Sequence, residues 1–297
     1  FLKKNNFTSQ KRNLFFTISL LLFCILFISD SIAQTSKKKK DDTPKKKTIY
    51  ISIDALAQKI NDIEEDVNVK PKIVNPAGRW GSIMRLVRDA KLSRKDAIDS
   101  MNVWTNQMWD YMEELVKKKK TKKYSDKEWV FPVRGYTAAA IGGRNGSGYI
   151  PQGFDFFEVN SGGHPAHDIF ISDANQDCVD DYTGKYVDIL SMSGGIVVET
   201  RTNWTPEMDD IRGGNIVYIY DNYTNGLFYY AHLKEVDVKV GDLVKPGTKL
   251  GTMGRTGKNA YPSRSPTHLH LMYVRSFDGD LRPEDVYNDL IKDKTIQ

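Results

Sequence analysis

The residues of this chain best suited to metal chemistry are its histidines. There are five of them in 297 residues, and all lie between positions 164 and 270: His164, His167, His232, His268 and His270. A neutral imidazole binds zinc, and it also exchanges protons near neutral pH. The clustering therefore indicates a metal site or an acid–base site in the second half of the chain.

The pair His268 and His270 lies in an apolar run typical of a β-strand. Residues two apart on a strand face the same side, about 6–7 Å from each other. One imidazole could then bind a metal while the other reaches a water on that metal. The spacing does not decide which of the two is the ligand.

His164 and Asp168 are four residues apart, which on a straight strand would separate them by about 13 Å. Gly162, Gly163 and Pro165 allow the chain to bend back, so that both side chains can converge. Two imidazoles and one carboxylate leave zinc an open position for water, whose pKa then falls toward neutrality. That set is typical of a catalytic site, and His232, at a strand end, is available for the same cavity.

The elements that must position these residues are predicted to be strands. Short β-rich runs cover residues 195–199, 215–220, 227–232 and 268–274, and Asn225-Gly226 predicts a two-residue hairpin turn between the second and third runs. Residues 49–125 instead show helical periodicity, with Ser93 and Asp96 as a capping pair. We expect a helical region over 49–125 and a β-rich domain over 129–297 that ends in a helix.

The N-terminus has the pattern of an export signal. Residues 1–33 combine basic residues, an apolar run from Leu14 to Ile28 and small residues before Ala33, which predicts a signal peptide. An uncleaved membrane anchor is the alternative. Residues 34–48 are rich in lysine and predict a disordered linker. We therefore expect an exported protein of the periplasm or the cell surface.

The positive charge of the chain belongs to these leading segments. The whole sequence has 43 Lys+Arg and 38 Asp+Glu, but the part from Trp129 onward has 16 against 22. A nucleic-acid partner is therefore excluded for the β-rich domain. Cys178 is the one cysteine beyond the predicted signal peptide, so we expect no intrachain disulfide.

An ordered set of motifs carries a resemblance to a known family. His164-x3-Asp168, then Tyr230-Ala231-His232-Leu233, then residues 240–248 (VGDLVKPGT), then His268-x-His270, resemble the lysostaphin and LytM type of zinc endopeptidases over residues 131–274. The resemblance implies an all-β catalytic domain built on a curved antiparallel sheet, here preceded by a smaller, mainly α-helical region. It also implies that His164, Asp168 and His270 bind Zn²⁺, that His268 is the general base and that His232 stabilises the oxyanion. The substrate would be a peptide cross-link or stem of bacterial peptidoglycan.

Two other functions remain open at this point. One is a wall-binding protein, or an activator of another wall hydrolase, that retains a structural metal. The other is a peptidase that acts on ordinary secreted proteins. We expect a monomer, and the helical region leaves room for an envelope protein partner. His167 could line the cleft, orient a ligand or be exposed, and the acidic segment from Asp173 to Asp181 is interpreted as a solvated turn rather than a calcium loop.

Overall fold

The computed structural model describes residues 75–158, 161–263 and 265–297. The chain divides into two units, Phe1–Lys70 and Pro71–Gln297, and every described residue lies in the second. The predicted signal peptide (1–33), the predicted linker (34–48) and the first part of the predicted helical region fall outside the described residues. Within those residues, no helix combines the length and the apolar character that crossing a bilayer requires.

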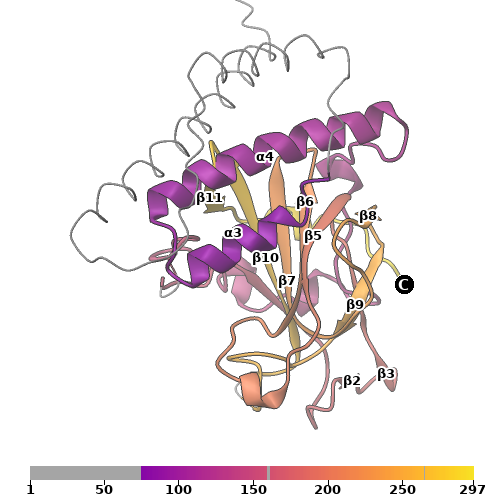
Figure 1. The fold of residues 1–297 in the computed structure, drawn as a ribbon. Coiled ribbons are helices and arrows are strands. Elements are labelled where there is room, and N and C mark those ends of the chain that lie inside the picture. Colours follow the sequence, from indigo (N-terminus) through magenta and orange to yellow (C-terminus); the bar gives the residue numbers. More distant parts are fainter. Residues whose placement is uncertain (1–74, 159–160, 264) are drawn as a thin grey trace, which may run out of the picture. The chain divides into compact units, whose positions relative to one another are not determined.

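The second unit is built on an antiparallel sheet, as the sequence predicts (Figure 1). Its strands run in the order β1 (His167–Phe170), β10 (His268–Phe277), β7 (Gly226–Val236), β6 (Asn215–Asp221), β5 (Gly195–Arg201) and β8 (Leu243–Val244). Off this path, β11 (Asp280–Pro283) pairs with β10, while β9 (Lys249–Met253) pairs with β4 (Asp188–Leu190) and β7. A separate ribbon joins β2 (Val179–Asp180) to β3 (Lys185–Tyr186). The four predicted β-rich runs are β5, β6, β7 and β10.

The sheet buries apolar side chains on both faces, and successive residues alternate between them. On β10, Leu271 and Tyr273 belong to one core, whereas Met272 and Val274 belong to the other. His268 and His270 continue the second series, so the histidine pair lies on the same face as Met272. That second core also contains the buried residues of the two N-terminal helices.

Helices α3 (Arg79–Arg88) and α4 (Arg94–Lys117) cover part of this face (Figure 1). α3 packs on α4 and β5, and α4 packs on β10 and β11. Trp80 and Trp104 are fully buried, with ring centroids 5.0 Å apart. The predicted capping of α4 is confirmed, because the Ser93 hydroxyl accepts the amide N–H of Asp96. The described part of the predicted helical region therefore shares a core with the sheet.

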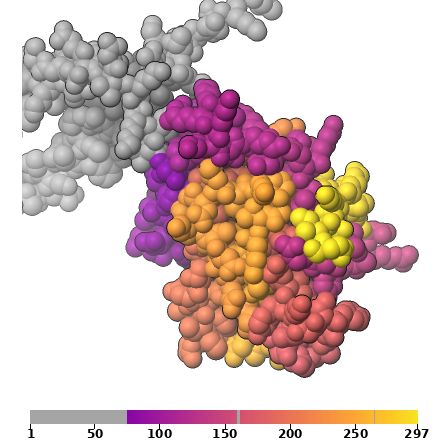
Figure 2. Space-filling view, turned by 90° about the vertical axis from the view of Figure 1, so that its right-hand side faces the viewer, coloured from indigo at the N-terminus to yellow at the C-terminus, as the bar shows by residue number. Residues whose placement is uncertain are grey.

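The remaining helices are short. α5 covers Tyr287–Leu290 and agrees with the predicted C-terminal helix, and single 3₁₀ turns lie at Asp126–Glu128, Ala138–Ala140, Arg144–Gly146 and Pro206–Met208. The chain end lies on the surface next to residues near 130 (Figure 2), where the Phe131 amide donates to the Lys294 carbonyl over 3.0 Å. This contact ties the last residues to the start of the β-rich region.

The hairpin at Asn225-Gly226 differs from the predicted two-residue turn. β6 ends at Asp221, which pairs with Gly226 at the start of β7, so the turn has four residues, 222–225. Only Asn225 adopts a positive φ (57°), while Gly226 is already a strand residue. A Cβ at Gly226 would lie 2.5 Å from the Tyr273 hydroxyl. The glycine is thus needed for a close approach between strands and not for the turn.

Candidate metal centre and active site

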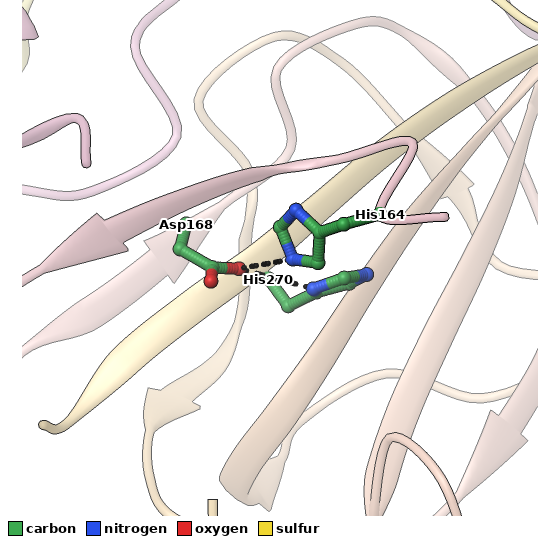
Figure 3. Close-up of side chains that lie close together, drawn as sticks. All are labelled: His164, Asp168 and His270. Carbon is green, nitrogen blue, oxygen red and sulfur yellow. Dashed lines mark hydrogen bonds and ion pairs between the residues drawn. The ribbon is translucent and has the colours of Figure 1, made fainter. Parts of the chain in front are cut away.

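Three side chains converge at the junction of β1 and β10 (Figure 3). The Asp168 Oδ1 atom lies 3.3 Å from His164 Nε2 and 3.0 Å from His270 Nδ1. One potential ligand atom from each residue lies within 4.8 Å of the other two. Asp168 and His270 are directly opposite each other in the pairing of β1 with β10. The sheet register therefore places two of the three side chains together.

The third side chain, His164, reaches the cluster because the chain bends before β1. Gly163 has a φ of +79°, a region that disfavours residues with a Cβ. A Cβ there would also lie 2.8 Å from the carbonyl oxygens of Gln152 and Ile150. His164 then pairs with Ile150 through two backbone hydrogen bonds of 2.6 and 2.8 Å. The predicted return of the chain between His164 and Asp168 is confirmed.

Backbone carbonyls fix the tautomer of three histidines. Nδ1 lies 2.8 Å from the Gly148 carbonyl in His164, 2.7 Å from the Thr256 carbonyl in His232 and 2.7 Å from the Pro266 carbonyl in His268. A carbonyl oxygen can only accept, so each Nδ1 must carry the proton that it donates. Each neutral ring consequently has its lone pair at Nε2, free to bind a metal or to accept a proton.

His268 and His232 lie beside the cluster and are themselves buried. His268 Nε2 is 3.7 Å from Asp168 Oδ1, and the rings of His232 and His268 are 4.8 Å apart. His232 lies at a positive φ of 63° within β7, between register shifts in the pairing of β7 with β6 and β9. Such strain in a non-glycine residue persists only where the surrounding structure enforces it. The irregular backbone turns the ring of His232 toward His268.

Burial and mutual contact set the charges of these groups. Burial opposes ionisation of Asp168, but hydrogen bonds with His164 and His270 outweigh it and hold the Asp168 pKa well below its usual range. Contact with Asp168 raises the pKa of His164. Burial lowers the pKa of His268, and it lowers that of His232 to about 3, helped by the two neighbouring imidazoles. The cavity thus favours the neutral forms of the two buried imidazoles, His232 and His268, that lie beside the Asp168 carboxylate.

The donor set fits zinc. It combines two imidazole nitrogens with one carboxylate oxygen, and the His164 tautomer directs a lone pair into the cluster. Three protein ligands of this kind leave zinc a further position for water, which is the pattern of catalytic rather than structural zinc. The residues present are therefore suited to hold Zn²⁺ in an open site.

The structure separates His167 from this site. Its side chain is 1% exposed, its Nε2 lies 2.8 Å from Asp285 Oδ1, and its ring stacks on Tyr149. His167 precedes Asp168 on β1, so the two side chains point to opposite faces of the sheet. His167 therefore neither lines the cleft nor is exposed, and it connects β1 to the segment before α5.

The acidic segment is a hydrogen-bonded turn. The Asp173 carboxylate accepts the amides of Asp177 and Cys178 and the hydroxyl of Thr267, the last over 2.6 Å. Among the described residues, the group formed by His164, Asp168 and His270 is the one that meets the geometry of a metal site. The aspartates of this segment instead accept backbone N–H groups of the segment itself, and Asp173 also accepts the Thr267 hydroxyl next to β10.

Sequence reasoning missed one buried charge, Arg255, which is 6% exposed. Its guanidinium donates to the carbonyls of Ala260 and Pro262 over 3.0 and 3.1 Å, and to the Thr267 hydroxyl over 3.2 Å. These bonds anchor the loop that ends at Pro266, the carbonyl partner of His268. No local sequence signal marks Arg255, since its partners become visible only once the loop is folded.

A cavity of about 570 Å³ opens over the cluster. His164, Asp168, His232, His268 and His270 all line it, together with Met84, Val87 and Arg88 of α3. The cavity is large enough for several residues of an extended peptide. The site is therefore an open groove whose walls include one of the N-terminal helices.

Comparison with known proteins identifies related sequences. Residues 176–280 match the model of peptidase family M23. The chain is 32% identical over 109 residues to glycyl-glycine endopeptidase ALE-1 of Staphylococcus capitis, an alignment that covers 37% of this chain and 27% of the relative. It is 30% identical over 137 residues to lysostaphin of Staphylococcus simulans, covering 46% of this chain and 22% of the relative. The alignments thus span about a quarter of these relatives.

Two solved structures of lysostaphin are also among the matches. The catalytic domain of lysostaphin from Staphylococcus simulans is 26% identical, with a TM-score of 0.32, and the match covers 48% of this chain and 88% of that one. The solution structure of lysostaphin is 25% identical, with a TM-score of 0.36, over 57% of this chain and 56% of the other. The matched family region includes His232, His268 and His270, whereas His164 and Asp168 precede it. Residues 176–280 of this chain are thus similar to peptidase family M23.

Proposed function

We propose that this protein is a zinc-dependent endopeptidase that hydrolyses peptide cross-links or stems of bacterial peptidoglycan. The observation that carries the proposal is the convergence of His164 Nε2, Asp168 Oδ1 and His270 Nδ1 beside the second imidazole of the pair on β10. We assign metal binding to these three residues. The wall as substrate is supported by the relatives, among which are lysostaphin and a glycyl-glycine endopeptidase.

Zinc, when bound, would lower the pKa of a water at its open position, so that hydroxide becomes available near neutral pH. His268 is suited to take the proton from that water, because its lone pair is at Nε2 and faces the cluster. The resulting imidazolium can then donate the proton to the amine that leaves. The Pro266 carbonyl holds the ring in place throughout, since its bond to Nδ1 is the same in both protonation states.

His232 is assigned to the oxyanion that forms on the scissile carbonyl. Its Nδ1 proton is committed to the Thr256 carbonyl, so it can donate to an oxyanion only after Nε2 has gained a proton. The nearby rings of His268 and His270 oppose a second positive charge in the same space. The one proton that His268 takes from the water can therefore charge His268 or His232 in turn, but not both, and it leaves from His268 to the departing amine.

The proposal also assigns a role to each region of the chain and a location to the protein. Residues 129–297 would provide the catalytic groups, residues 49–125 would complete the groove through α3, and the whole protein would act after export to the periplasm or the cell surface. The non-catalytic alternative, a wall-binding protein or activator, predicts that zinc binding persists without any hydrolysis.

The test is a paired assay on His268→Ala. Wild-type protein should bind about one zinc per chain and release soluble muropeptides from purified peptidoglycan, and a chelator should abolish the release. The variant should keep its zinc but lose activity by about 10²- to 10⁴-fold, because it lacks the general base. Zinc content and muropeptide release are measured on the same samples.

His167→Gln is the matched control, since it removes a buried histidine that lies outside the groove. It should retain zinc and activity at temperatures at which it is folded. Wild-type protein that binds zinc but cuts neither wall nor denatured protein would favour the non-catalytic alternative. Cleavage of denatured protein without cleavage of wall would instead point to a general secreted peptidase.

A further inference from the structure

The groove extends beyond the histidines along a row of aromatic rings. The ring of Tyr229 lies 6.0 Å from that of His270, the ring of Tyr218 lies 4.5 Å farther on, and Trp80 of α3 follows at 5.3 Å. Tyr218 and Tyr229 line the cavity, which ends against Met84, Val87 and Arg88 of α3. A peptide bound at the candidate metal centre can therefore extend along the two tyrosines to the helix.

Two arginines line this end of the groove, Arg88 from α3 and Arg201 from β5, and Arg212 from the loop before β6 also lines the cavity. One carboxylate lies among them, that of Glu199, whose Oε2 accepts the indole N–H of Trp80 over 2.9 Å. Burial raises the pKa of Glu199, while Arg201, Arg88 and Arg85 act to lower it. Glu199 thus faces more positive charge than it can neutralise.

The arginines lack close partners of their own. Within the described ranges, none of Arg88, Arg201 and Arg212 forms an ion pair, whereas the nearby Arg94 pairs with Asp155 over 2.6 Å. The Nε atom of Arg201 is buried without a hydrogen-bond partner, and its Nη2 donates to the Arg212 carbonyl over 3.2 Å. A buried guanidinium N–H without an acceptor is unfavourable. The Nε–H of Arg201 therefore still needs a hydrogen-bond acceptor.

The other charged residues that line the cavity do not supply this acceptor. Asp155 is neutralised by Arg94, and Asp168 belongs to the histidine cluster. Glu158 and Lys258 have opposite charges and both line the cavity. The surplus positive charge of the groove thus lies at the α3 end, beyond Tyr218.

We propose that Arg88 and Arg201 form a carboxylate-binding subsite of the groove. A guanidinium donates two parallel N–H bonds to a carboxylate, a geometry that an uncharged peptide cannot use. The preferred substrate is then an acidic peptide with a free carboxylate a few residues from the scissile bond, as in peptidoglycan stems, and not an uncharged glycine bridge. This specificity rests on the proposed function, but the subsite itself can be tested by binding alone.

The experiment compares two forms of one peptidoglycan preparation, native and with its carboxylates converted to amides. Binding by the full-length, zinc-loaded chain is measured by co-sedimentation in a His268→Ala background, so that the wall is not digested. Arg88→Gln/Arg201→Gln is compared with the matched control Lys119→Gln/Lys245→Gln, which removes two exposed positive charges outside the groove. Arg88→Gln alone serves if the double variant does not fold, because Arg88 is exposed at the surface.

The parent, which carries only His268→Ala, should bind native wall about tenfold more tightly than amidated wall, and the lysine control should keep this preference. The arginine variant should lose most of this preference. The Lys-rich N-terminal segment is present in every variant, so any preference that it contributes is the same in all of them. A preference as large in the arginine variant as in the control, or its absence from the parent, would overturn the subsite.

Muropeptide release by the corresponding proteins with His268 intact separates the two proposals. If binding depends on the arginines but the parent releases nothing from either wall, the subsite stands and the peptidase function fails. If the parent releases muropeptides from both walls at one rate that the arginine variant matches, the peptidase function stands and the subsite fails.

Discussion

At the scale of single residues, the candidate site depends as much on backbone atoms as on its side chains. The carbonyls of Gly148, Thr256 and Pro266 determine which nitrogen of His164, His232 and His268 carries the proton. Replacing a side chain elsewhere in these loops would move the carbonyl and thereby change the chemistry of the ring. The residues at which the backbone bends are therefore as important to the site as the donors themselves.

Gly163 is the clearest of these residues. Gly163→Ala should weaken zinc binding by at least about tenfold, because the new Cβ would collide with the carbonyls of Gln152 and Ile150 and displace His164. Gly184→Ala is the control, since Gly184 also has a positive φ (65°) but open space around its Cβ position. Zinc affinity measured by competition with a chelator distinguishes them. Equal affinities in the two variants would contradict the role assigned to Gly163.

Much of the site could be predicted at this scale, because the histidine spacing and strand alternation act locally. The common face of His268 and His270 and the return of His164 toward Asp168 both follow from short-range geometry. The separate roles of His268 and His270 did not follow from their spacing and were predicted only from the family resemblance, since structurally they depend on Pro266 and on the register of β1 with β10. Their assignment as base and ligand stays a prediction until the variants are measured.

At the scale of elements, the unexpected feature is the position of α3. Its apolar residues indicate an amphipathic helix. The local sequence does not indicate, however, that Trp80 inserts among Trp104, Tyr218 and Phe156. Glu199, which accepts the Trp80 indole N–H, follows a register shift in the pairing of β5 with β6, and such a shift is a long-range feature. The helix and the strands were predictable separately, whereas their common groove was not.

Trp80→Phe tests how α3 is held. Phenylalanine keeps most of the buried ring but leaves the Glu199 carboxylate without its indole donor, which should cost about 1–3 kcal/mol in the free energy of unfolding. Amide hydrogen exchange should accelerate in residues 79–88 while the sheet stays protected.

Trp204→Phe provides the comparison, because its indole donates to the Met208 carbonyl over 2.7 Å within its own loop. Urea unfolding and exchange by mass spectrometry are measured on both variants. If exchange in α3 rises no more in Trp80→Phe than in Trp204→Phe, the indole bond does not hold the helix.

At the scale of the whole molecule, a buried carboxylate makes stability depend on pH. Asp221 is fully buried at the end of β6, and burial raises its pKa to about 7. A folded-state pKa above the unfolded value favours the protonated form, so this contribution to stability is complete below about pH 4 and is lost as pH rises to about 7. The free energy of unfolding should therefore decrease across that interval, by up to about 1.4 kcal/mol per pH unit from this group.

Asp221→Asn should remove that component, because the amide does not ionise. Between pH 5 and pH 8, the free energy of unfolding of the variant should rise relative to that of wild type. It is measured by urea unfolding with the protein saturated with zinc throughout. Asp278→Asn, at an exposed position with a positive φ that asparagine tolerates, should leave the slope unchanged. A slope that is identical in wild type and Asp221→Asn would show that Asp221 titrates normally in the folded protein.

The pairing of Asp168 with His270 has a mechanical consequence. β1 is the last strand on its side of the sheet and has four residues; it pairs with β10, and its other edge has one isolated bridge, between Ile169 and Ile141. A metal ion held by residues on both strands would act as a crosslink that fastens this edge. Demetallation would then free the edge as well as stop the chemistry, and an exposed strand edge is a template for pairing with other chains. The ion would in that way protect the protein from self-association.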